Sequence, residues 1–323
     1  MPLTIQLPRL GGPEVLTAVE APVAAPGPGE LHIRQTVVGF NYLDVYLRKG
    51  VYSVDLPAVL GVEAVGRVVA VGEGVTDFAP GDRVAYAGPM GAYAQERLLP
   101  ADQAVPVPDG VDDETAAALL FKGLTAHMLL RRVYPVKAGD TVLVHSAAGG
   151  VGLVLARWAK SLGATVVGTV GSAAKVEAAR SAGADHVAVL GRDDAAALVR
   201  QVTGGAGAHA VFDAVGRDTF ETSLRSLRPF GVLASYGQAS GEVPPVEAQT
   251  LSNHGSVMFV RPSVYRHIAD TAQYRAAAAE VFELIRRGTL TAAIGNRFPL
   301  AEVAEAHRQA EARATTGATL LIP

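Results

Sequence analysis

The stretch that decides the fold of this chain runs from Thr141 to Gly152 and reads Thr-Val-Leu-Val-His-Ser-Ala-Ala-Gly-Gly-Val-Gly. Its first part, Val142 to Val144, is apolar without alternation, which is typical of a strand buried on both faces of a parallel sheet. Apolar residues then recur at helical spacing from Val151 to Leu162, and Gly163 stands where a glycine commonly ends a helix. The stretch therefore predicts a strand, a tight turn and a helix.

The turn is a variant of the glycine fingerprint of dinucleotide-binding proteins, with Ala147 at the first glycine position and Gly149 and Gly152 at the second and third. We expect Gly149 to let the backbone approach a pyrophosphate and Gly152 to let the helix pack closely on the strand. Similar glycines also occur in turns that only connect a strand to a helix. A second apolar strand, Thr165 to Val170, ends about 20 residues after the glycines, where a dinucleotide unit places its ribose-contacting residue. This spacing favours the nucleotide-binding interpretation.

Length and composition place the chain among ordinary globular proteins. Its 323 residues, 49% hydrophobic and 18% charged, suffice for about two domains. A formal net charge of −3 without a basic run argues against nucleic acid or an anionic membrane surface as the main partner. Cysteine is absent, which excludes disulfides and thiolate metal ligands. Met1 to Thr4 do not resemble a signal peptide and no apolar run reaches the ~18 residues of a membrane span, so we expect a cytoplasmic protein.

The first part of the chain reads as mostly β and the middle as alternating β and α. Residues 31–39 alternate, and residues 60–75 carry glycines among valines, as a small curved sheet or barrel requires. Acidic residues at 112–114 predict the start of a helix. From Thr141 onward, six apolar strands with helical segments between most of them match the count of a doubly wound dinucleotide domain. These strands are predicted at 141–145, 165–170, 186–190, 210–215, 231–236 and 256–260.

The alternation of strands and helices ends in the last part of the chain. It predicts a helix from about residue 271 to Gly288, a helix over residues 301–312 and a closing strand over residues 319–322. Such a tail is too short to form a domain alone, so we expect it to return to the N-terminal part. The sequence therefore predicts an α/β fold with a discontinuous β-rich domain of residues 1–121 and 263–323 and a dinucleotide-binding domain of residues 122–262.

Several pieces of sequence, met in order, carry a family resemblance. They are Asn41 to Arg48, Gly50 to Tyr52, Gly61 to Glu63, Ala147 to Gly152, Trp158 to Lys160, Arg261 to Ser263 and Arg313 to Gly317. Through them nearly the whole chain resembles the medium-chain dehydrogenase/reductase superfamily, and within it the zinc-free NADPH:quinone oxidoreductases, the group that includes zeta-crystallin. The resemblance implies a GroES-like β-rich catalytic domain, a six-stranded Rossmann domain that binds NADPH, and a homodimer. The apolar segment 256–260 at the expected sheet edge also favours a symmetric partner through this domain.

Zinc alcohol dehydrogenases of the same superfamily hold a catalytic metal with cysteine and with the histidine of a Gly-His-Glu segment. Here that segment reads Gly61-Val62-Glu63, and the eight histidines of the chain show no close pair in the sequence. A zinc site needs several nitrogen or sulfur ligands at suitable spacing. We therefore predict an enzyme without a metal.

The resemblance assigns Asn41, Tyr46 and Tyr52 to the catalytic site beside the nicotinamide. An amide can hold a carboxamide or an acceptor oxygen, and a phenol can donate a hydrogen bond to a developing oxyanion. The alternative for the tyrosines is packing with satisfied hydroxyls. Glu63 stays open between a site residue and a structural hydrogen-bond partner. His145, at the end of the first strand, is interpreted as an imidazole satisfied by backbone groups of the turn rather than as a proton donor.

The expected cofactor-binding residues gather mainly at strand ends of the dinucleotide domain. They are Asn41, Thr125, Ala148, Gly149, Gly150, Val151, Gly171, Ser172, Lys175, Tyr236, Gly237, Phe259, Val260, Arg261 and Arg313. After the second strand, Ser172 and Lys175 precede any carboxylate, which favours NADPH over NADH. Where the resemblance implies a tyrosine at the ribose phosphate, the chain has Leu190, and whether Arg192 replaces that contact stays open.

These observations predict an NADPH-dependent oxidoreductase that reduces a quinone or a similar conjugated carbonyl compound. No strong nucleophile or acid–base pair stands out, which suits a reaction that needs mainly proximity and a bound cofactor. Two alternatives stay open. One is an NADPH-dependent enone or alkenal double-bond reductase, which shares the fold and the cofactor. The other is a protein that binds NADPH with little catalysis, as the crystallin relatives suggest.

Overall fold

A computed structural model describes residues 1–323 and divides the chain into two compact units. Unit 1 comprises Met1–Phe121 and Ile268–Pro323, and unit 2 comprises Lys122–His267. The second boundary lies at 267/268 rather than at the expected 262/263. The short helix α8 (Val264–His267) accounts for this difference, because Nε2 of His267 lies 2.9 Å from Nδ1 of His127 in unit 2.

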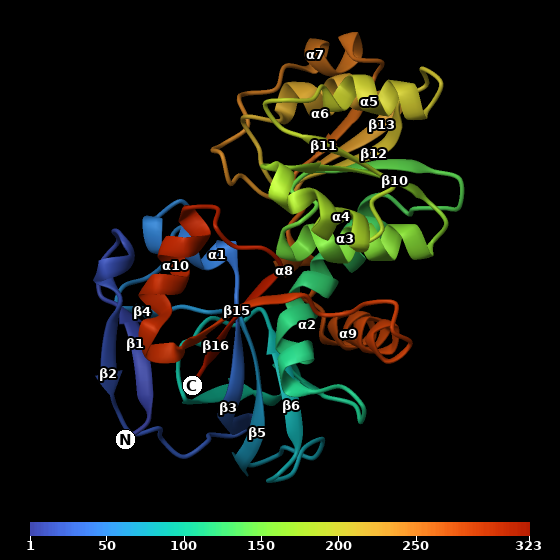
Figure 1. Ribbon diagram of the computed structural model, residues 1–323. Coiled ribbons are helices and arrows are strands. Elements are labelled where there is room, and N and C mark those ends of the chain that lie inside the picture. Colours follow the sequence, from blue (N-terminus) through green and yellow to red (C-terminus); the bar gives the residue numbers. More distant parts are fainter. The chain divides into compact units, whose positions relative to one another are not determined.

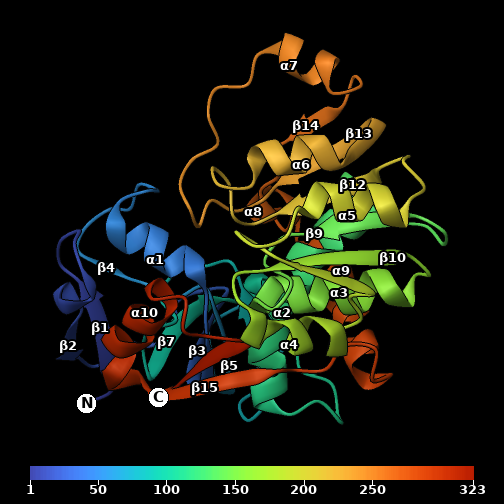
Figure 2. The same ribbon diagram turned by 45° about the horizontal axis from the view of Figure 1, so that its top comes forward.

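Unit 2 contains one parallel sheet of six strands in the order β11-β10-β9-β12-β13-β14. Figure 1 labels β10, β11, β12 and β13 of this sheet. The order reverses between β9 and β12, which is the switch point of a doubly wound sheet. Helices α3 and α4 cover one face and α5 and α6 cover the other (Figure 2). The predicted fold class is thereby confirmed for this unit. The strands are β9 (Thr141–Val144), β10 (Thr165–Val170), β11 (His186–Val189), β12 (Ala208–Asp213), β13 (Leu227–Ser235) and β14 (Met258–Val260).

The helices of unit 2 follow the same alternation. The first of them, α3, begins right after the glycine-rich turn, and a Cβ placed on Gly152 in its first turn would lie 2.1 Å from the Ser146 carbonyl oxygen. Only glycine lets the helix approach the strand so closely. The helical elements are α3 (Gly150–Ser161), η4 (Ala173–Lys175), α4 (Val176–Ser181), α5 (Ala195–Val202), α6 (Phe220–Ser226) and α7 (Ala248–Asn253), with η3 (Met128–Val133) before the sheet.

Unit 1 is built on a seven-stranded sheet in the order β15-β16-β3-β5-β6-β8, with β7 paired to β3, and on a small sheet β2-β1-β4. The C-terminal strand β16 lies against β3, with Leu320 opposite Gly39. Strands β3 and β5 come close together at a bulge beside Gly66. A Cβ on Gly66 would lie 2.4 Å from the Arg34 carbonyl oxygen, so only glycine fits there. The strands are β1 (Leu3–Leu7), β2 (Thr17–Glu20), β3 (Glu30–Phe40), β4 (Ala58–Val59), β5 (Glu63–Val71), β6 (Arg83–Ala87), β7 (Glu96–Pro100), β8 (Ala104–Pro106), β15 (Ile294–Pro299) and β16 (Ala318–Ile322).

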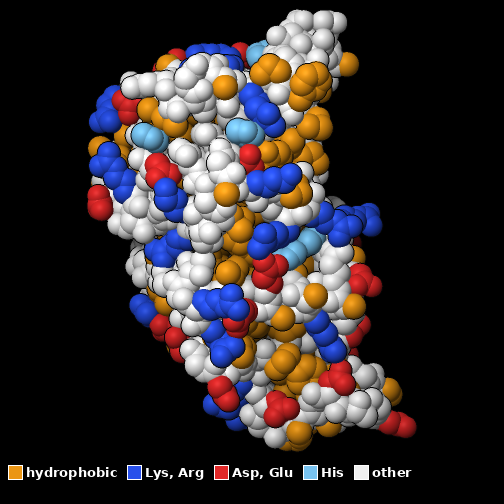
Figure 3. Space-filling view, turned by 90° about the vertical axis from the view of Figure 1, so that its right-hand side faces the viewer, with side chains coloured by type: hydrophobic (Ala, Val, Ile, Leu, Met, Phe, Trp, Pro, Cys, Tyr) orange, Lys and Arg blue, Asp and Glu red, His pale blue; other side chains and the backbone are white.

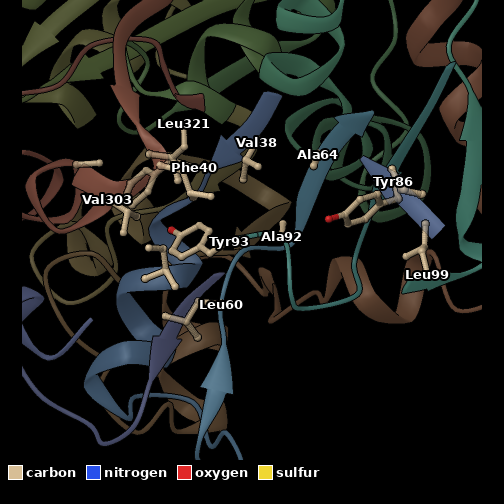
Figure 4. Packing of buried hydrophobic residues seen from close by; sticks show 14 of the residues in the cluster. Val38, Phe40, Leu60, Ala64, Tyr86, Ala92, Tyr93, Leu99, Val303 and Leu321 are labelled. Carbon is tan, nitrogen blue, oxygen red and sulfur yellow. The ribbon is translucent and has the colours of Figure 1, made fainter. Parts of the chain in front are cut away.

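Helices close the core of unit 1. Figure 4 shows the ring of Tyr93 beside Phe40 and Val303, so that residues from β3, a loop and α10 share one apolar cluster. The predicted helix at the 112–114 acidic residues is α2 (Asp113–His127), which begins in unit 1 and ends in unit 2. The other helical elements of this unit are η1 (Pro13–Val15), α1 (Tyr42–Lys49), η2 (Ala101–Gln103), α9 (Thr271–Arg286), η5 (Leu300–Glu302) and α10 (Val303–Glu311).

The surface carries charges of both signs. On the face shown in Figure 3, lysine and arginine side chains are interspersed with aspartate and glutamate side chains, in keeping with the net charge of −3. No helix of the chain combines the length and the apolar character that crossing a membrane requires.

Candidate functional site

In unit 2 the predicted cofactor residues follow the carboxyl ends of four strands. Ala148 to Val151 follow β9, Gly171 and Ser172 follow β10, Tyr236 and Gly237 follow β13, and Arg261 follows β14. Because all strands of this sheet are parallel, these ends lie on one edge. Open α/β sheets bind ligands at this edge, beside the switch point.

The turn after β9 fits a pyrophosphate. Gly149 is the N-cap residue of α3, and the backbone N–H groups of Gly150 and Val151 stand in the first turn, where no intrahelical acceptor exists for them. A Cβ on Gly149 would lie 3.0 Å from Oγ of Ser146, so a larger residue would crowd the turn. A helix N-terminus with glycine in front of it attracts anions through its N–H groups and its dipole.

The turn after β10 has the composition that an adenosine 2′-phosphate requires. Ser172 is exposed, and no atom lies within 4 Å of a Cβ built on Gly171, so the turn is open. Lys175 is half-buried at the end of η4. Residues 171–176 hold no carboxylate, and a carboxylate is what an NAD-specific unit places here. Arg192, which follows β11, is exposed, and its Nε donates to the neighbouring Asp193 over 3.0 Å.

The ends of β13 and β14 are held together by an arginine. Nη1 of Arg261 donates to the carbonyl oxygens of Ser235, at 2.8 Å, and of Gly237, at 2.9 Å. These contacts fix the backbone around Tyr236. The Phe259 ring lies in a T-shaped contact with Phe220, 5.8 Å between centroids, and therefore packs on the core of the unit.

Two further predicted residues of unit 2 are buried, while Val260 is half-buried at the end of β14. Thr125, in the last turns of α2, is 7% exposed, and Ala148 is 3% exposed. Neither side chain offers much surface to a ligand. We infer that any contact from Ala148 comes from its backbone, as in the neighbouring glycines.

His145 follows β9 and is fully buried. The interpretation that backbone groups of the turn satisfy its imidazole is wrong. Nδ1 lies 2.9 Å from Oγ1 of Thr169 and Nε2 lies 3.1 Å from Oγ of Ser223, so both nitrogens have side-chain hydroxyl partners. Burial lowers the pKa of His145 below its ordinary value, with a smaller opposite effect from Asp213. The imidazole is therefore a neutral internal hydrogen-bond bridge.

In unit 1, Asn41 precedes α1 and is 8% exposed. Its Nδ2 donates to Oε1 of Glu63 over 2.8 Å. The other carboxyl oxygen of Glu63 accepts the backbone N–H of Phe121 at 2.9 Å. Glu63, which is fully buried, thus connects the start of α1 to α2 and fixes the orientation of the Asn41 amide.

The two predicted tyrosines belong to a row of three aromatic rings. Tyr46 lies 5.1 Å from Tyr42 and 5.5 Å from Tyr52 between ring centroids, both in T-shaped contacts. Tyr46 is half-buried, and Tyr52 is 37% exposed. The packing alternative and the site alternative are therefore compatible, because each ring packs against a neighbour while Tyr52 keeps part of its surface open.

Ion pairs hold the C-terminal end of α1 to the end of α10. Arg48, fully buried, and Lys49 both pair with Glu311 at the end of α10. Nε2 of His307, on α10, lies 3.2 Å from the Tyr93 hydroxyl. Burial, aided by the Arg48 charge, lowers the pKa of His307 to about 3.

The predicted cofactor residue Arg313 follows α10. It has a left-handed backbone, with φ of 57°, and is exposed.

No metal-binding geometry is present among residues 1–323. No group of three or more histidine, aspartate or glutamate side chains is placed to hold an ion. Val62, at the position where zinc relatives carry histidine, is fully buried and apolar. Glu63 beside it already accepts two hydrogen bonds.

Sequence reasoning missed Asp213, which ends β12 and is 1% exposed. Its carboxyl group accepts hydrogen bonds from Thr219 and Ser223 and from two backbone N–H groups. The signal that could have found it is an acidic residue placed directly at the end of the apolar run Ala210-Val211-Phe212. A charged residue in that place has to be paired.

The chain is similar over nearly its whole length to known proteins. Residues 27–109 match the alcohol dehydrogenase GroES-like domain family, and residues 150–285 match the zinc-binding dehydrogenase family. The chain is 45% identical to a quinone oxidoreductase of Pseudomonas aeruginosa over 99% of each chain. It is 40% identical to a 2-haloacrylate reductase of a Burkholderia species over 98% of this chain and 97% of the relative. The crystal structure of Escherichia coli quinone oxidoreductase complexed with NADPH superposes with a TM-score of 0.97 at 41% identity, covering 99% of this chain and 100% of that one.

Proposed function

We propose, from the premise that this chain belongs to the quinone oxidoreductase family of the medium-chain dehydrogenase/reductase superfamily, that it reduces quinones with NADPH and without a metal ion. The observation that carries the proposal is the carboxyl edge of unit 2. There the turn after β9 offers N–H groups at a helix N-terminus, and the turn after β10 offers Ser172 and Lys175 in place of a carboxylate. The first turn suits the pyrophosphate of NADPH, and the second suits the 2′-phosphate on its adenosine.

In this proposal the backbone of Gly149, Gly150 and Val151 holds the pyrophosphate of NADPH, and Lys175 holds the 2′-phosphate. Tyr236 and Gly237 face the nicotinamide half, because their strand belongs to the other half of the sheet. When bound, NADPH supplies the hydride. The chain's own residues bind the two reactants, orient them and keep water away.

The quinone that accepts the hydride is proposed to bind at Asn41, Tyr46 and Tyr52. The Asn41 amide is held by Glu63 and keeps one direction, which an orienting group needs. Tyr52 is 37% exposed, and a phenol hydroxyl can donate a hydrogen bond to a quinone oxygen that becomes negative. The ring faces of the aromatic row suit a planar apolar substrate.

The metal-free part of the proposal rests on the ligand inventory. The chain has no cysteine, Val62 stands at the histidine position of zinc relatives, and Glu63 is occupied by Asn41 and Phe121. Chelators should leave activity unchanged, and metal analysis should find no stoichiometric zinc. One equivalent of tightly bound zinc per chain would contradict this part.

A second candidate function is reduction of the double bond of an enone or alkenal. The similarity to a 2-haloacrylate reductase favours it, since that relative is also named for an activated alkene. Steady-state turnover of a simple quinone and of a small enone, each with NADPH, separates the two candidates. A kcat/KM for the enone above that for the quinone would reverse the order of the two functions.

A third possibility is a protein that binds NADPH with little catalysis. Titration of NADPH fluorescence measures binding, and a panel of quinones and enones measures consumption. Saturable binding with no consumption on the whole panel would leave only this binding function. Absence of NADPH binding to the wild type would remove all three.

We also propose a homodimer formed through the β14 edge of unit 2. This edge strand is short and unpaired on one side, Met258 is 53% exposed, and Phe230 on the neighbouring strand β13 is 70% exposed. Apolar side chains on an open strand edge favour pairing with a second copy. Light scattering should give twice the chain mass of 33.4 kDa, and Met258→Glu should shift the particle toward the monomer. A wild-type monomer at micromolar concentration would contradict the dimer.

A further inference from the structure

Unit 2 buries a continuous row of polar side chains beneath the carboxyl edge of its sheet. The row begins at Thr169 on β10, passes through His145 after β9 and reaches Asp213 at the end of β12. Thr219 and Ser223 complete it, and each of the five is at most 1% exposed. Burying such groups costs free energy unless every one finds a partner. Apolar side chains would fill this space at a lower cost in free energy, so the polar row is expected to have a further role.

The hydrogen atoms of the row can be assigned from its donors and acceptors. Ser223 donates from Oγ to Oδ2 of Asp213 over 2.8 Å, so the contact of 3.1 Å between Ser223 and Nε2 of His145 needs the hydrogen on the imidazole. Nδ1 of His145 then accepts from Oγ1 of Thr169, at 2.9 Å. Thr219 donates to Asp213 with distances of 2.8 and 2.9 Å. Every polar side-chain atom in this chain of bonds has a partner, and the chain crosses the switch point between β9 and β12.

Asp213 connects this row to two backbone loops. Its Oδ1 accepts the N–H of Val215 at 2.7 Å and of Gly216 at 3.1 Å. Its own carbonyl oxygen accepts the N–H of Tyr236 at 2.8 Å and of Gly237 at 3.2 Å. One residue thus holds the loop after β12 and the loop after β13.

The two loops also touch each other closely. A Cβ on Gly237 would lie 2.5 Å from the Ala214 carbonyl oxygen, and a Cβ on Gly216 would lie 2.5 Å from the Gly241 carbonyl oxygen. At both glycines the two backbones are too close for a larger residue to fit without a shift. A shift of the loop after β12 would therefore be transmitted to Tyr236.

We propose that Asp213, supported by Thr219, Ser223 and His145, is a positioning residue for the nicotinamide half of bound NADPH. The inference rests on the proposed function. A dinucleotide lies across the switch point with one nucleotide on each half of the sheet. The phosphate-binding turns follow β9 and β10 in the first half, whereas both loops held by Asp213 belong to the second half.

The test compares two ligands on one variant. NADPH carries both halves of the dinucleotide, whereas 2′,5′-ADP carries the 2′-phosphorylated adenosine and no nicotinamide. Asp213→Asn keeps the size of the side chain but cannot accept from all four of its donors. We expect its Kd for NADPH to rise about 10-fold, in line with the loss of charge-assisted hydrogen bonds, and its Kd for 2′,5′-ADP to change less than about 2-fold.

A matched control lies at the opposite edge of the same sheet. Asp140 precedes β9, is 8% exposed and accepts the Lys137 N–H at 2.8 Å and the Tyr134 hydroxyl at 3.2 Å. Asp140→Asn should lower the thermal midpoint of the apo protein but leave both Kd values unchanged. This control separates loss of stability from loss of positioning.

A second pair of variants covers the case in which Asp213→Asn does not fold. Thr219→Val replaces the hydroxyl with a methyl group of similar shape and should weaken NADPH but not 2′,5′-ADP, whereas Thr219→Ser keeps the hydroxyl and should restore wild-type binding. Equal weakening of both ligands, or NADPH binding like that of the wild type in Asp213→Asn and Thr219→Val, overturns the inference. If either result is found while the wild type binds NADPH, only the inference about Asp213 fails and the proposed function stands.

Discussion

Glu63 holds Asn41 with a hydrogen bond of 2.8 Å between Oε1 and Nδ2, in an interior where the glutamate side chain has no solvent-exposed surface. This contact joins the residue that zinc relatives place beside a metal ligand to the residue proposed to orient the substrates. The same carboxyl group accepts from the Phe121 N–H at 2.9 Å, so one side chain connects α1 and α2 of unit 1. A buried, hydrogen-bonded carboxyl group thus fixes the orientation of the Asn41 amide.

Replacement of Glu63 should therefore affect both stability and turnover. Glu63→Ala leaves the Asn41 amide and the Phe121 N–H without this acceptor, and should lower the free energy of unfolding by about 2–4 kcal/mol. Glu63→Gln can accept from one of the two donors only, and should lower kcat for a quinone roughly 10-fold while the protein stays folded. Urea unfolding and steady-state kinetics measure these effects. The exposed Glu73 supplies the control, Glu73→Gln, and wild-type kcat in a folded Glu63→Gln would assign Glu63 a purely structural role.

Gly152 and Gly171 make a matched pair of substitutions. A Cβ at Gly152 meets the Ser146 carbonyl oxygen at 2.1 Å and the Ala147 Cα at 2.9 Å, whereas a Cβ at Gly171 meets nothing within 4 Å. Gly152→Ala should lower the free energy of unfolding by about 2–4 kcal/mol, because the contact involves backbone that cannot move aside. Thermal melting should show almost no change for Gly171→Ala. Equal melting temperatures for the two variants would mean that the β9 turn can rearrange.

His307 makes the stability of unit 1 sensitive to acid. Burial, aided by the Arg48 charge, lowers its pKa in the folded state to about 3, against 6.5 for an ordinary imidazole. The unfolded chain therefore binds the proton first, so stability is complete above about pH 6.5 and falls as the pH decreases toward 3. His307→Gln removes this group, and between pH 6.5 and 5 it should lose about 2 kcal/mol less than the wild type. Urea unfolding at the two pH values measures the difference, and parallel losses in both proteins would show that His307 is protonated in the fold.

The sequence was sufficient for the parts of the fold that repeat a pattern. Apolar strands such as 142–144 and the glycines around Gly152 follow from period and backbone geometry, which are local properties. The strand predicted over 256–260 begins only at Met258, because Gly255 and Ser256 adopt left-handed backbones with φ of 95° and 56°. That turn depends on its contact with Pro229 and Phe230, far away in the sequence.

The site was less accessible to sequence reasoning for the same physical reason. The residues next to each apolar run predicted where the strands end. The hydrogen-bond partners of His145, in contrast, are 24 and 78 residues away in the sequence, at Thr169 and Ser223. Which hydroxyl reaches a buried imidazole depends on tertiary packing, and no spacing rule encodes it. The Asn41–Glu63 contact is of the same kind, because it crosses from the start of α1 to β5.

The last prediction concerns the choice between NADPH and NADH. Lys175 is half-buried at the end of η4, next to the open turn at Gly171 and Ser172, and the first carboxylate after β10 is Glu177. In the proposed complex its ammonium group makes a charge-assisted hydrogen bond to the 2′-phosphate, worth about 1.5–3 kcal/mol. Lys175→Ala should therefore raise the Kd for NADPH roughly 10- to 100-fold and hardly change that for NADH, which lacks the phosphate. Lys137→Ala is the matched control, because it removes an exposed lysine at the opposite edge of the sheet, before β9. Fluorescence titration of both cofactors with the three proteins decides the matter: if Lys175→Ala weakens NADPH and NADH equally, or if the wild type binds both with the same Kd, Lys175 does not recognise the 2′-phosphate.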